Sequence, residues 1–171
     1  TDDIAVINFK ADDDAGNRDI YAQIAVFSPG VTSGSEQGRL VINTNDGSAG
    51  LQNRIDCITN ETVFNNGSAD IDFRVESDAY THMIFVDAGN NHVGVGTDTP
   101  LSALHVATAA SGVSSVGTTN DDLILENSGD VGFSILCPND HIGSIVFGDP
   151  DDNNVGMLQY NHASDVMEFG R

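Results

Sequence analysis

An acidic loop near residue 150 is the strongest candidate for chemistry in this sequence. Asp149, Asp151 and Asn153 offer side-chain oxygens at alternate positions, as calcium loops do for a cation that takes six to eight oxygen ligands. The loop is not an EF-hand, because Asn154 stands where the turn needs glycine and Tyr160 stands where a bidentate glutamate belongs. The sequence favours a solvated turn, with calcium held between loops or subunits as the alternative.

The sequence contains no motif that is typical of a catalytic site. There is no G-x-S-x-G nucleophile turn and no phosphate-binding loop, and Lys10 is the only lysine. The five histidines are scattered at spacings that suit neither a helix nor a zinc site: His82, His92, His105, His141 and His162. Carboxylate pairs for glycoside hydrolysis stay open, because 26 acids make chance pairs common. We expect no enzyme and no cofactor, unless the acidic loop holds calcium.

The charge balance excludes several classes of partner. Twenty-six acids against six bases give a formal net charge of −20 and a pI near 4.1. Nucleic-acid binding needs clustered Lys and Arg, and anionic membrane surfaces attract the same residues. No apolar run approaches the roughly 20 residues of a membrane span. We therefore expect neither nucleic acid nor membrane insertion, and an acidic surface that resists aggregation.

Alternation of apolar and polar residues, with turn residues between the runs, predicts an all-β fold. Residues 71–76 place Ile, Phe and Val on one face and Asp, Arg and Glu on the other, which is typical of a half-buried strand. Similar runs predict strands at 4–9, 20–27, 39–43, 54–59, 81–86, 92–95, 104–106, 122–126, 133–137, 144–147, 156–160 and 166–169. Pro100 could open a short helix, although 104–106 reads equally well as a strand.

One small, polar and uncharged stretch divides the chain. Residues 107–119 (ATAASGVSSVGTT) have the composition of a linker. They separate a first hairpin unit, 1–106, from a second, 120–171. The sequence stops at Phe169-Gly170-Arg171 as though inside a strand, so we expect a piece of a longer polypeptide.

The two units share a motif at an offset of 62 residues. Its pattern is apolar-Phe-x-Asp-x₃-Asn-x-Val-Gly, and residues 7–17 hold a looser third copy. The matched positions are Phe85, Asp87, Asn91, Val93 and Gly94 in the first copy, and Phe147, Asp149, Asn153, Val155 and Gly156 in the second. The pattern predicts a recurring hairpin, in which an Asp/Asn/Gly turn joins two strands. Hairpins that cannot bury their own apolar faces must stack or pair.

These patterns resemble the shaft of tailed-bacteriophage tail-fibre proteins. The resemblance lies in residues 73–78, 83–87, 93–97 and 100–106, and more loosely in 7–40 and 122–162. The self-cleaving chaperone domain with which such fibres often end has no counterpart here. The resemblance implies an elongated, intertwined homotrimer of repeated antiparallel hairpins, located on the virion as an extracellular appendage.

Three functional classes follow from these observations. The favoured one is a structural virion fibre that projects from the particle, contacts other virion proteins and supports host attachment. The alternatives are a module at a fibre tip that binds a receptor or a host surface glycan, and a spike that degrades polysaccharide. Repeated hairpins favour the first class, and the eight Phe residues lie in strand frames that indicate packing rather than a sugar platform.

Self-association is expected from the sequence, and it has an electrostatic cost. The apolar strand faces are short and interrupted by Gly, so one chain has too little apolar surface to form a closed core. Identical chains packed about one axis would bury those faces. Three chains would carry about −60, three times −20. Outward-facing acids, salt screening or cations at Asp12–Asp14 and Asp149–Asp152 would have to offset the repulsion.

We predict that Cys57 and Cys137 remain thiols. They lie far apart in the sequence in apolar runs, and a disulfide scaffold would contain more cysteine. An intact mass measured without reductant should equal that of the dithiol form. A mass lower by two hydrogens would show a disulfide instead.

Overall fold

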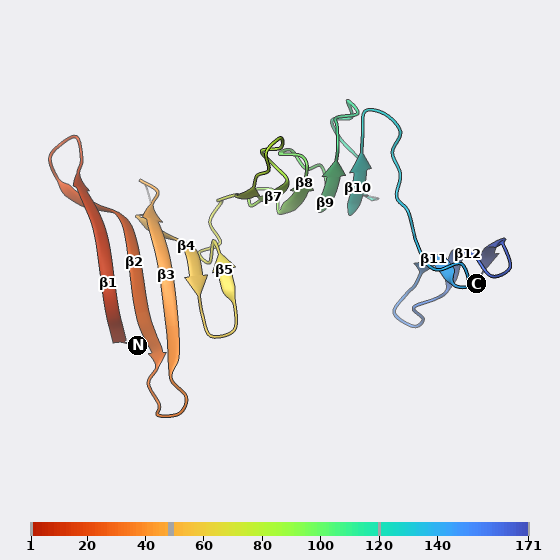
Figure 1. Ribbon diagram of the computed structural model, residues 1–171. Helices are drawn as coiled ribbons and strands as arrows, with labels where there is room; N and C mark the ends of the chain where they lie inside the picture. Colours follow the sequence, from red (N-terminus) through yellow and green to blue (C-terminus); the bar gives the residue numbers. More distant parts are fainter. Residues whose placement is uncertain (1, 48–49, 120, 171) are drawn as a thin grey trace. The chain divides into compact units, whose positions relative to one another are not determined.

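The computed structural model describes residues 2–47, 50–119 and 121–170, and all its regular structure is β (Figure 1). Thirteen strands form three sheets, and no helix occurs among these residues, so the predicted all-β class is confirmed. The short helix considered after Thr99 is not formed there. Within the described ranges, no helix is long and apolar enough to cross a membrane.

The first sheet is an antiparallel meander of five strands in sequence order. Its strands are β1 (Asp2–Asp12), β2 (Arg18–Gly30), β3 (Gln37–Asn45), β4 (Leu51–Cys57) and β5 (Thr62–Phe64). An Asp or Asn side chain closes the turns: the carboxylate of Asp13 accepts from the backbone N–H of Asn17 at 2.7 Å, and Asn45 accepts from Gly47 at 2.8 Å. The sequence did not predict β5, because three residues are too few to show alternation.

The second sheet mixes antiparallel and parallel pairing, in the order β10-β9-β8-β7-β6. Its strands are β6 (Phe73–Val75), β7 (Ile84–Asp87), β8 (His92–Val95), β9 (Leu104–Ala107) and β10 (Leu123–Glu126). The pairs β6–β7 and β7–β8 are antiparallel hairpins, whereas β8–β9 and β9–β10 are parallel. The expectation of hairpins throughout is therefore wrong for β9 and β10, because connections 96–103 and 108–122 return the chain to the same end.

Two glycines make the first of these parallel connections possible. Parallel neighbours usually need about a dozen or more residues between them, and only residues 96–103 separate β8 from β9. A Cβ on Gly94 would lie 2.4 Å from the carbonyl oxygen of Thr97, and one on Gly96 would lie 2.1 Å from that of Ala107. Gly96 also has a φ of +81°, in the left-handed region. The glycines of the Val-Gly-Val-Gly-Thr run thus allow the short connection between the parallel strands β8 and β9.

The third sheet has three antiparallel strands, β11 (Ile142–Phe147), β12 (Gly156–Asn161) and β13 (Val166–Gly170). Its first hairpin reproduces the one formed by β7 and β8. Phe85 pairs with Gly94 in the earlier hairpin, and Phe147 pairs with Gly156 in the later one. The repeated motif therefore encodes one hairpin register twice.

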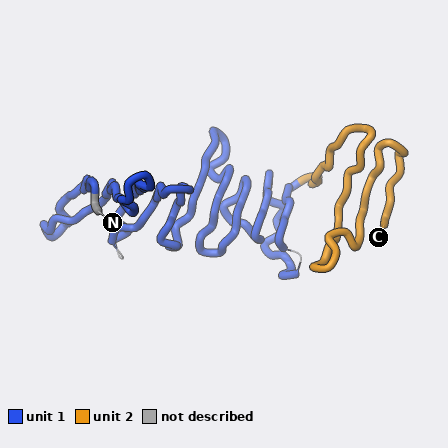
Figure 2. The backbone as a smooth tube through the Cα atoms, turned by 90° about the horizontal axis from the view of Figure 1, so that it is seen from below, with its two compact units in different colours: residues 1–128 blue, residues 129–171 orange. Residues whose placement is uncertain are grey.

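The chain divides into two compact units, residues 1–128 and 129–171 (Figure 2). The sequence had placed residues 120–126 in the second unit, after the linker-like stretch. In the structure β10 pairs with β9, so this segment belongs to the first unit. The difference arises because residues 108–122 separate the two parallel strands, and pairing over such a distance cannot be read from a local sequence pattern.

One strand expected in the second unit is missing. Residues 131–138 are assigned to no strand, although 133–137 alternate as a strand would. Their side chains stay exposed, with Phe133 at 65% and Leu136 at 89%. Ile135 packs beside β11 all the same, since a Cβ on Gly143 would meet it at 3.2 Å. Alternation predicted the segment's extended form, but not whether a pairing partner lies beside it.

We predict that Gly96→Ala lowers the free energy of unfolding by more than about 2 kcal/mol, because the methyl group collides with backbone and the left-handed φ becomes strained. Urea unfolding measures this loss. Gly117→Ala is the matched control, since a Cβ there meets nothing within 4 Å. Equal stability of the two variants would contradict the role given to Gly96.

Candidate functional site

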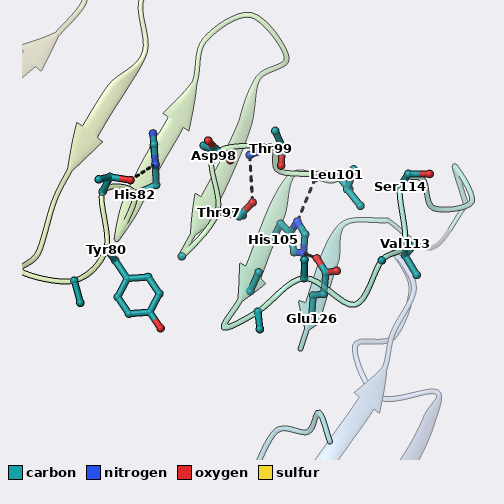
Figure 3. A pocket seen from close by; sticks show the side chains of 17 residues that line it. Tyr80, His82, Thr97, Asp98, Thr99, Leu101, His105, Val113, Ser114 and Glu126 are labelled. Carbon is teal, nitrogen blue, oxygen red and sulfur yellow. Dashed lines mark hydrogen bonds and ion pairs between the residues drawn. The ribbon is translucent and has the colours of Figure 1, made fainter. Parts of the chain in front are cut away.

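A cavity of the first unit lies beside the parallel strands β9 and β10 and has a volume of about 650 Å³ (Figure 3). Three segments supply its walls: residues 79–82 before β7, residues 96–101 after β8, and residues 107–114 after β9. His105 of β9 and Glu126 of β10 also line it. These are the only two strand positions in the lining that carry ionisable side chains.

His105 and Glu126 form a buried pair in this wall. The side chains are 1% and 12% exposed, and Nε2 of His105 lies 2.9 Å from Oε2 of Glu126. The two atoms are in ion-pair contact without the alignment of a hydrogen bond. On the other side of the ring, Nδ1 accepts the backbone N–H of Leu101 at 3.3 Å, as the dashed line in Figure 3 shows.

These contacts fix the state of the imidazole. Because Nδ1 accepts a hydrogen bond, the proton of the neutral ring sits on Nε2, where it faces the Glu126 carboxylate. A general base needs a ring nitrogen free to take a proton from a substrate. Nδ1 of His105 already accepts from Leu101, and Nε2 is buried against Glu126, so the side chain joins β9 to β10 and to the segment after β8.

Glu126 ties the segment after β9 back to the sheet. Its Oε1 accepts from the backbone N–H of Ser111 at 2.6 Å and from the Ser111 hydroxyl at 2.7 Å. These two hydrogen bonds, with a smaller contribution from His105, hold the pKa of Glu126 below its ordinary value, although burial opposes the shift. Ser111 lies in the linker-like stretch, which is therefore pinned to the sheet at this point.

A second polar cluster lies on the first sheet. Asp56 is fully buried, and Arg39 clamps it through two bonds, Nε to Oδ1 at 2.8 Å and Nη2 to Oδ2 at 2.6 Å. Asn53 and Asn66 donate to the same carboxylate. The Arg39 bonds are the main cause that lowers the pKa of Asp56, and they raise the pKa of Arg39 in turn. The clamp joins β3 to β4 and to the turn after β5.

Cross-strand register gives the first sheet one mixed face and one apolar face. On the mixed face a row of Val6, Ala25, Val41, Asp56 and Val63 lies beside a row of amides. An amide row crosses four strands as Asn8, Gln23, Asn43 and Asn53, with Gln23 donating to Asn8 at 2.8 Å and Asn43 donating to Gln23 at 3.0 Å. Asp56 lies on this same face, opposite Val41. The amide row matches polar groups only when the strands keep this register, so it resists a slip.

The opposite side, which we call the apolar face, consists of two rows that cross all five strands. One row is Ile7, Ile24, Ile42, Ile55 and Phe64, and the other is Ala5, Val26, Leu40, Cys57 and Thr62. Ile7 is 57% exposed and Phe64 is 51% exposed. Alternation predicted strands with one apolar side, but the register that aligns these side chains into rows emerged only from the pairing.

The acidic loop closes the hairpin between β11 and β12. Oδ1 of Asp149 accepts from the backbone N–H groups of Asp151 and Asp152, at 3.0 and 2.9 Å. Asp87 does the same in the related hairpin, accepting from Asn90 at 2.8 Å. Across residues 2–47, 50–119 and 121–170, no three His, Cys, Asp or Glu side chains gather as metal ligands, and calcium at Asp149, Asp151 and Asn153 stays a prediction.

Sequence reasoning missed the two polar clusters. His105 counted as one of five scattered histidines, and Asp56 as one acid among many. An Asp at an inward position of a strand was the available signal, but nothing in the sequence pairs it with Arg39. Cys57 and Cys137 are free thiols in different units, and Cys137 lies outside any strand rather than in the predicted one.

We predict that Glu126→Gln flattens the acid limb of the stability curve. A carboxyl whose pKa is lowered by folding stabilises the fold above its unfolded value of about 4.5. That contribution disappears as the pH falls through the lower folded value. Unfolding measured by urea between pH 6 and pH 3, roughly the window of that titration, should show a smaller loss in the variant. Parallel curves would contradict the anchoring by Ser111.

Comparisons with known proteins gave no match to this chain. No family model matches it, and neither a curated protein nor a solved structure gives a match. The resemblance to phage fibres thus rests on the strand and turn motifs of the sequence. The function has to be argued from the two faces of the first sheet and from the cavity at β9 and β10.

Proposed function

We propose that this chain is a structural module of a fibrous virion appendage, and that identical copies cover its apolar face about a common axis. The observation that carries the proposal is the apolar face itself. Across the described residues, only Ala25, Val41, Phe85 and Ala107 are buried apolar side chains. A chain with so small an apolar core needs a partner to remove its strand faces from water.

The apolar face crosses the whole first sheet as a narrow band. Five strands spaced about 4.8 Å apart span roughly 20 Å, and the two rows lie about 7 Å apart along each strand. The band of roughly 300 Å² is smaller than the ~800 Å² that each partner contributes to a standard stable interface. We therefore expect further surface of each copy to take part in the contact.

Charge favours this face over the others. Copies that each carry −20 repel one another, so they can approach only where their surfaces carry little charge. The two rows of the apolar face contain no Asp, Glu, Lys or Arg side chain. Contact through these rows leaves the acids of the turns in solvent.

Three copies are proposed because of the resemblance to tail-fibre shafts; the surface physics by itself supports only self-association. The virion location, the contacts with other virion proteins and the support of host attachment rest on that same resemblance. The engaged ring of His105 supports a structural rather than an enzymatic role. Calcium at the acidic turns would further offset the repulsion between copies.

We predict that the purified chain forms a trimer of about 54 kDa, three times 18.0 kDa, and that Ile7→Asp dissociates it. The variant places a carboxylate at the β1 end of the apolar face, next to copies that are already acidic. Light scattering coupled to gel filtration measures the mass. Ile7 is more than half exposed in a single chain, so the variant should keep its β circular dichroism.

Val31→Asp is the matched control. Val31 is 70% exposed but lies between β2 and β3, outside both rows of the apolar face. This variant should keep the mass of the parent. A parent of about 18 kDa at micromolar concentration would refute self-association, and equal dissociation of both variants would refute the assigned face.

A further inference from the structure

The cavity at β9 and β10 has no part in the proposed structural role. It lies within one chain and one unit, so an argument about it does not depend on self-association. Its volume of about 650 Å³ falls inside the range of about 300–1,000 Å³ typical of small-molecule sites. The walls come from three separate segments that the buried His105–Glu126 pair and the Ser111 hydrogen bonds hold in place.

Hydroxyl groups dominate the polar lining of this cavity. Tyr80, Thr99 and Ser114 present hydroxyls that have no hydrogen-bond partner among the described residues. Figure 3 shows them on different walls, with Tyr80 on the segment before β7 and Ser114 beyond β9. Each hydroxyl can both donate and accept. A ligand that offers many donors and acceptors would find hydrogen-bond partners on more than one wall.

The charge of the lining limits the ligand further. Asp98 and Glu126 are the acids of the cavity, and no Lys or Arg lines it. Glu126 is held ionised by Ser111, because those hydrogen bonds lower its pKa. The histidines His82 and His105 also line the cavity, and His105 is already paired with Glu126. A negatively charged ligand would therefore meet two carboxylates and no permanently charged cation. A neutral or positively charged ligand meets no such penalty.

The aromatic ring of Tyr80 adds a third requirement. Its side chain is 47% exposed while it lines the cavity, so part of the ring is open to a ligand. Aromatic faces pack against the C–H face of a pyranose ring, which leaves the sugar hydroxyls to reach polar groups at its edge. Leu101 and the alanines of the lining supply further apolar contact.

We propose that this cavity binds a saccharide without negative charge, either a neutral or an amino sugar. The ring packs on Tyr80, and its hydroxyls pair with the hydroxyls of Thr99 and Ser114. Asp98 is exposed at the rim and adds attraction for the ammonium group of an amino sugar. The site belongs to the glycan-binding class that the sequence left open, but it lies beside the strands of the first unit rather than in a long loop.

Three sugars that share one ring test the proposal on the full chain. Glucose is neutral, glucosamine carries a positive charge, and glucuronic acid carries a negative one. Titrations followed by ligand-observed NMR should show binding of glucose and glucosamine, with glucuronic acid weaker than both. Glucuronic acid that binds as well as glucosamine would overturn the charge argument, and three sugars that all fail to bind would overturn the site.

Two pairs of variants locate the binding. Tyr80→Ala should weaken glucose and glucosamine at least about fivefold, whereas Tyr21→Ala should not, although Tyr21 is 48% exposed on β2. Asp98→Lys should weaken glucosamine about fivefold and strengthen glucuronic acid. Asp14→Lys makes the same charge change in the turn between β1 and β2 and should alter neither.

The variants also separate binding from folding. Tyr80 and Asp98 are exposed, so urea unfolding of their variants should match that of the parent. Loss of binding at unchanged stability would support the site. Equal effects of Asp98→Lys and Asp14→Lys would show that net charge alone decides the affinity, and the proposal would fall.

Discussion

The first sheet carries an apolar face that its own strands leave exposed. Amides and Asp56 lie on one side of the sheet, and two apolar rows lie on the other. Ile7, Leu40 and Phe64 of these rows stay exposed. Because hydrophobic burial is the main driving force of folding, a sheet of this kind depends on other interactions to fix its strands.

Polar anchors hold strands where an apolar core would otherwise do so. The Arg39–Asp56 clamp joins β3 to β4, and the His105–Glu126 pair joins β9 to β10. Such pairs add little net stability over an apolar contact of equal shape, yet removal of one partner costs about 3–5 kcal/mol when the other is left buried. Here the pairs fix the register of the strands, because a strand that slipped by one residue would leave a buried charge without its partner. Short strands with few apolar contacts need that constraint more than long ones do.

The cavity at β9 and β10 results from the two connections that join the parallel strands. The return from β8 to β9 is so tight that only glycine fits at residues 94 and 96. The next return, over residues 108–122, is longer and is fastened to the sheet at Ser111. Between the short and the long connection a hollow remains, lined by their hydroxyls. The parallel arrangement therefore places a polar concavity between the connections of the first unit.

The sequence by itself determined the class of fold, most strand positions and the hairpin motif, because these depend on local alternation and on Asp, Asn and Gly at turns. Phe85 with Gly94 and Phe147 with Gly156 show this well, since one motif gave one register twice. Only the tertiary structure decided the parallel pairing of β8, β9 and β10, the absence of a strand at 133–137, and the partners of Asp56 and His105. Each of these joins residues that are distant in the chain. Alternation predicts which side of a strand is apolar, but it does not predict which strand will pair with it. Nor does the sequence distinguish a buried charged side chain from a solvated one before its partner is known.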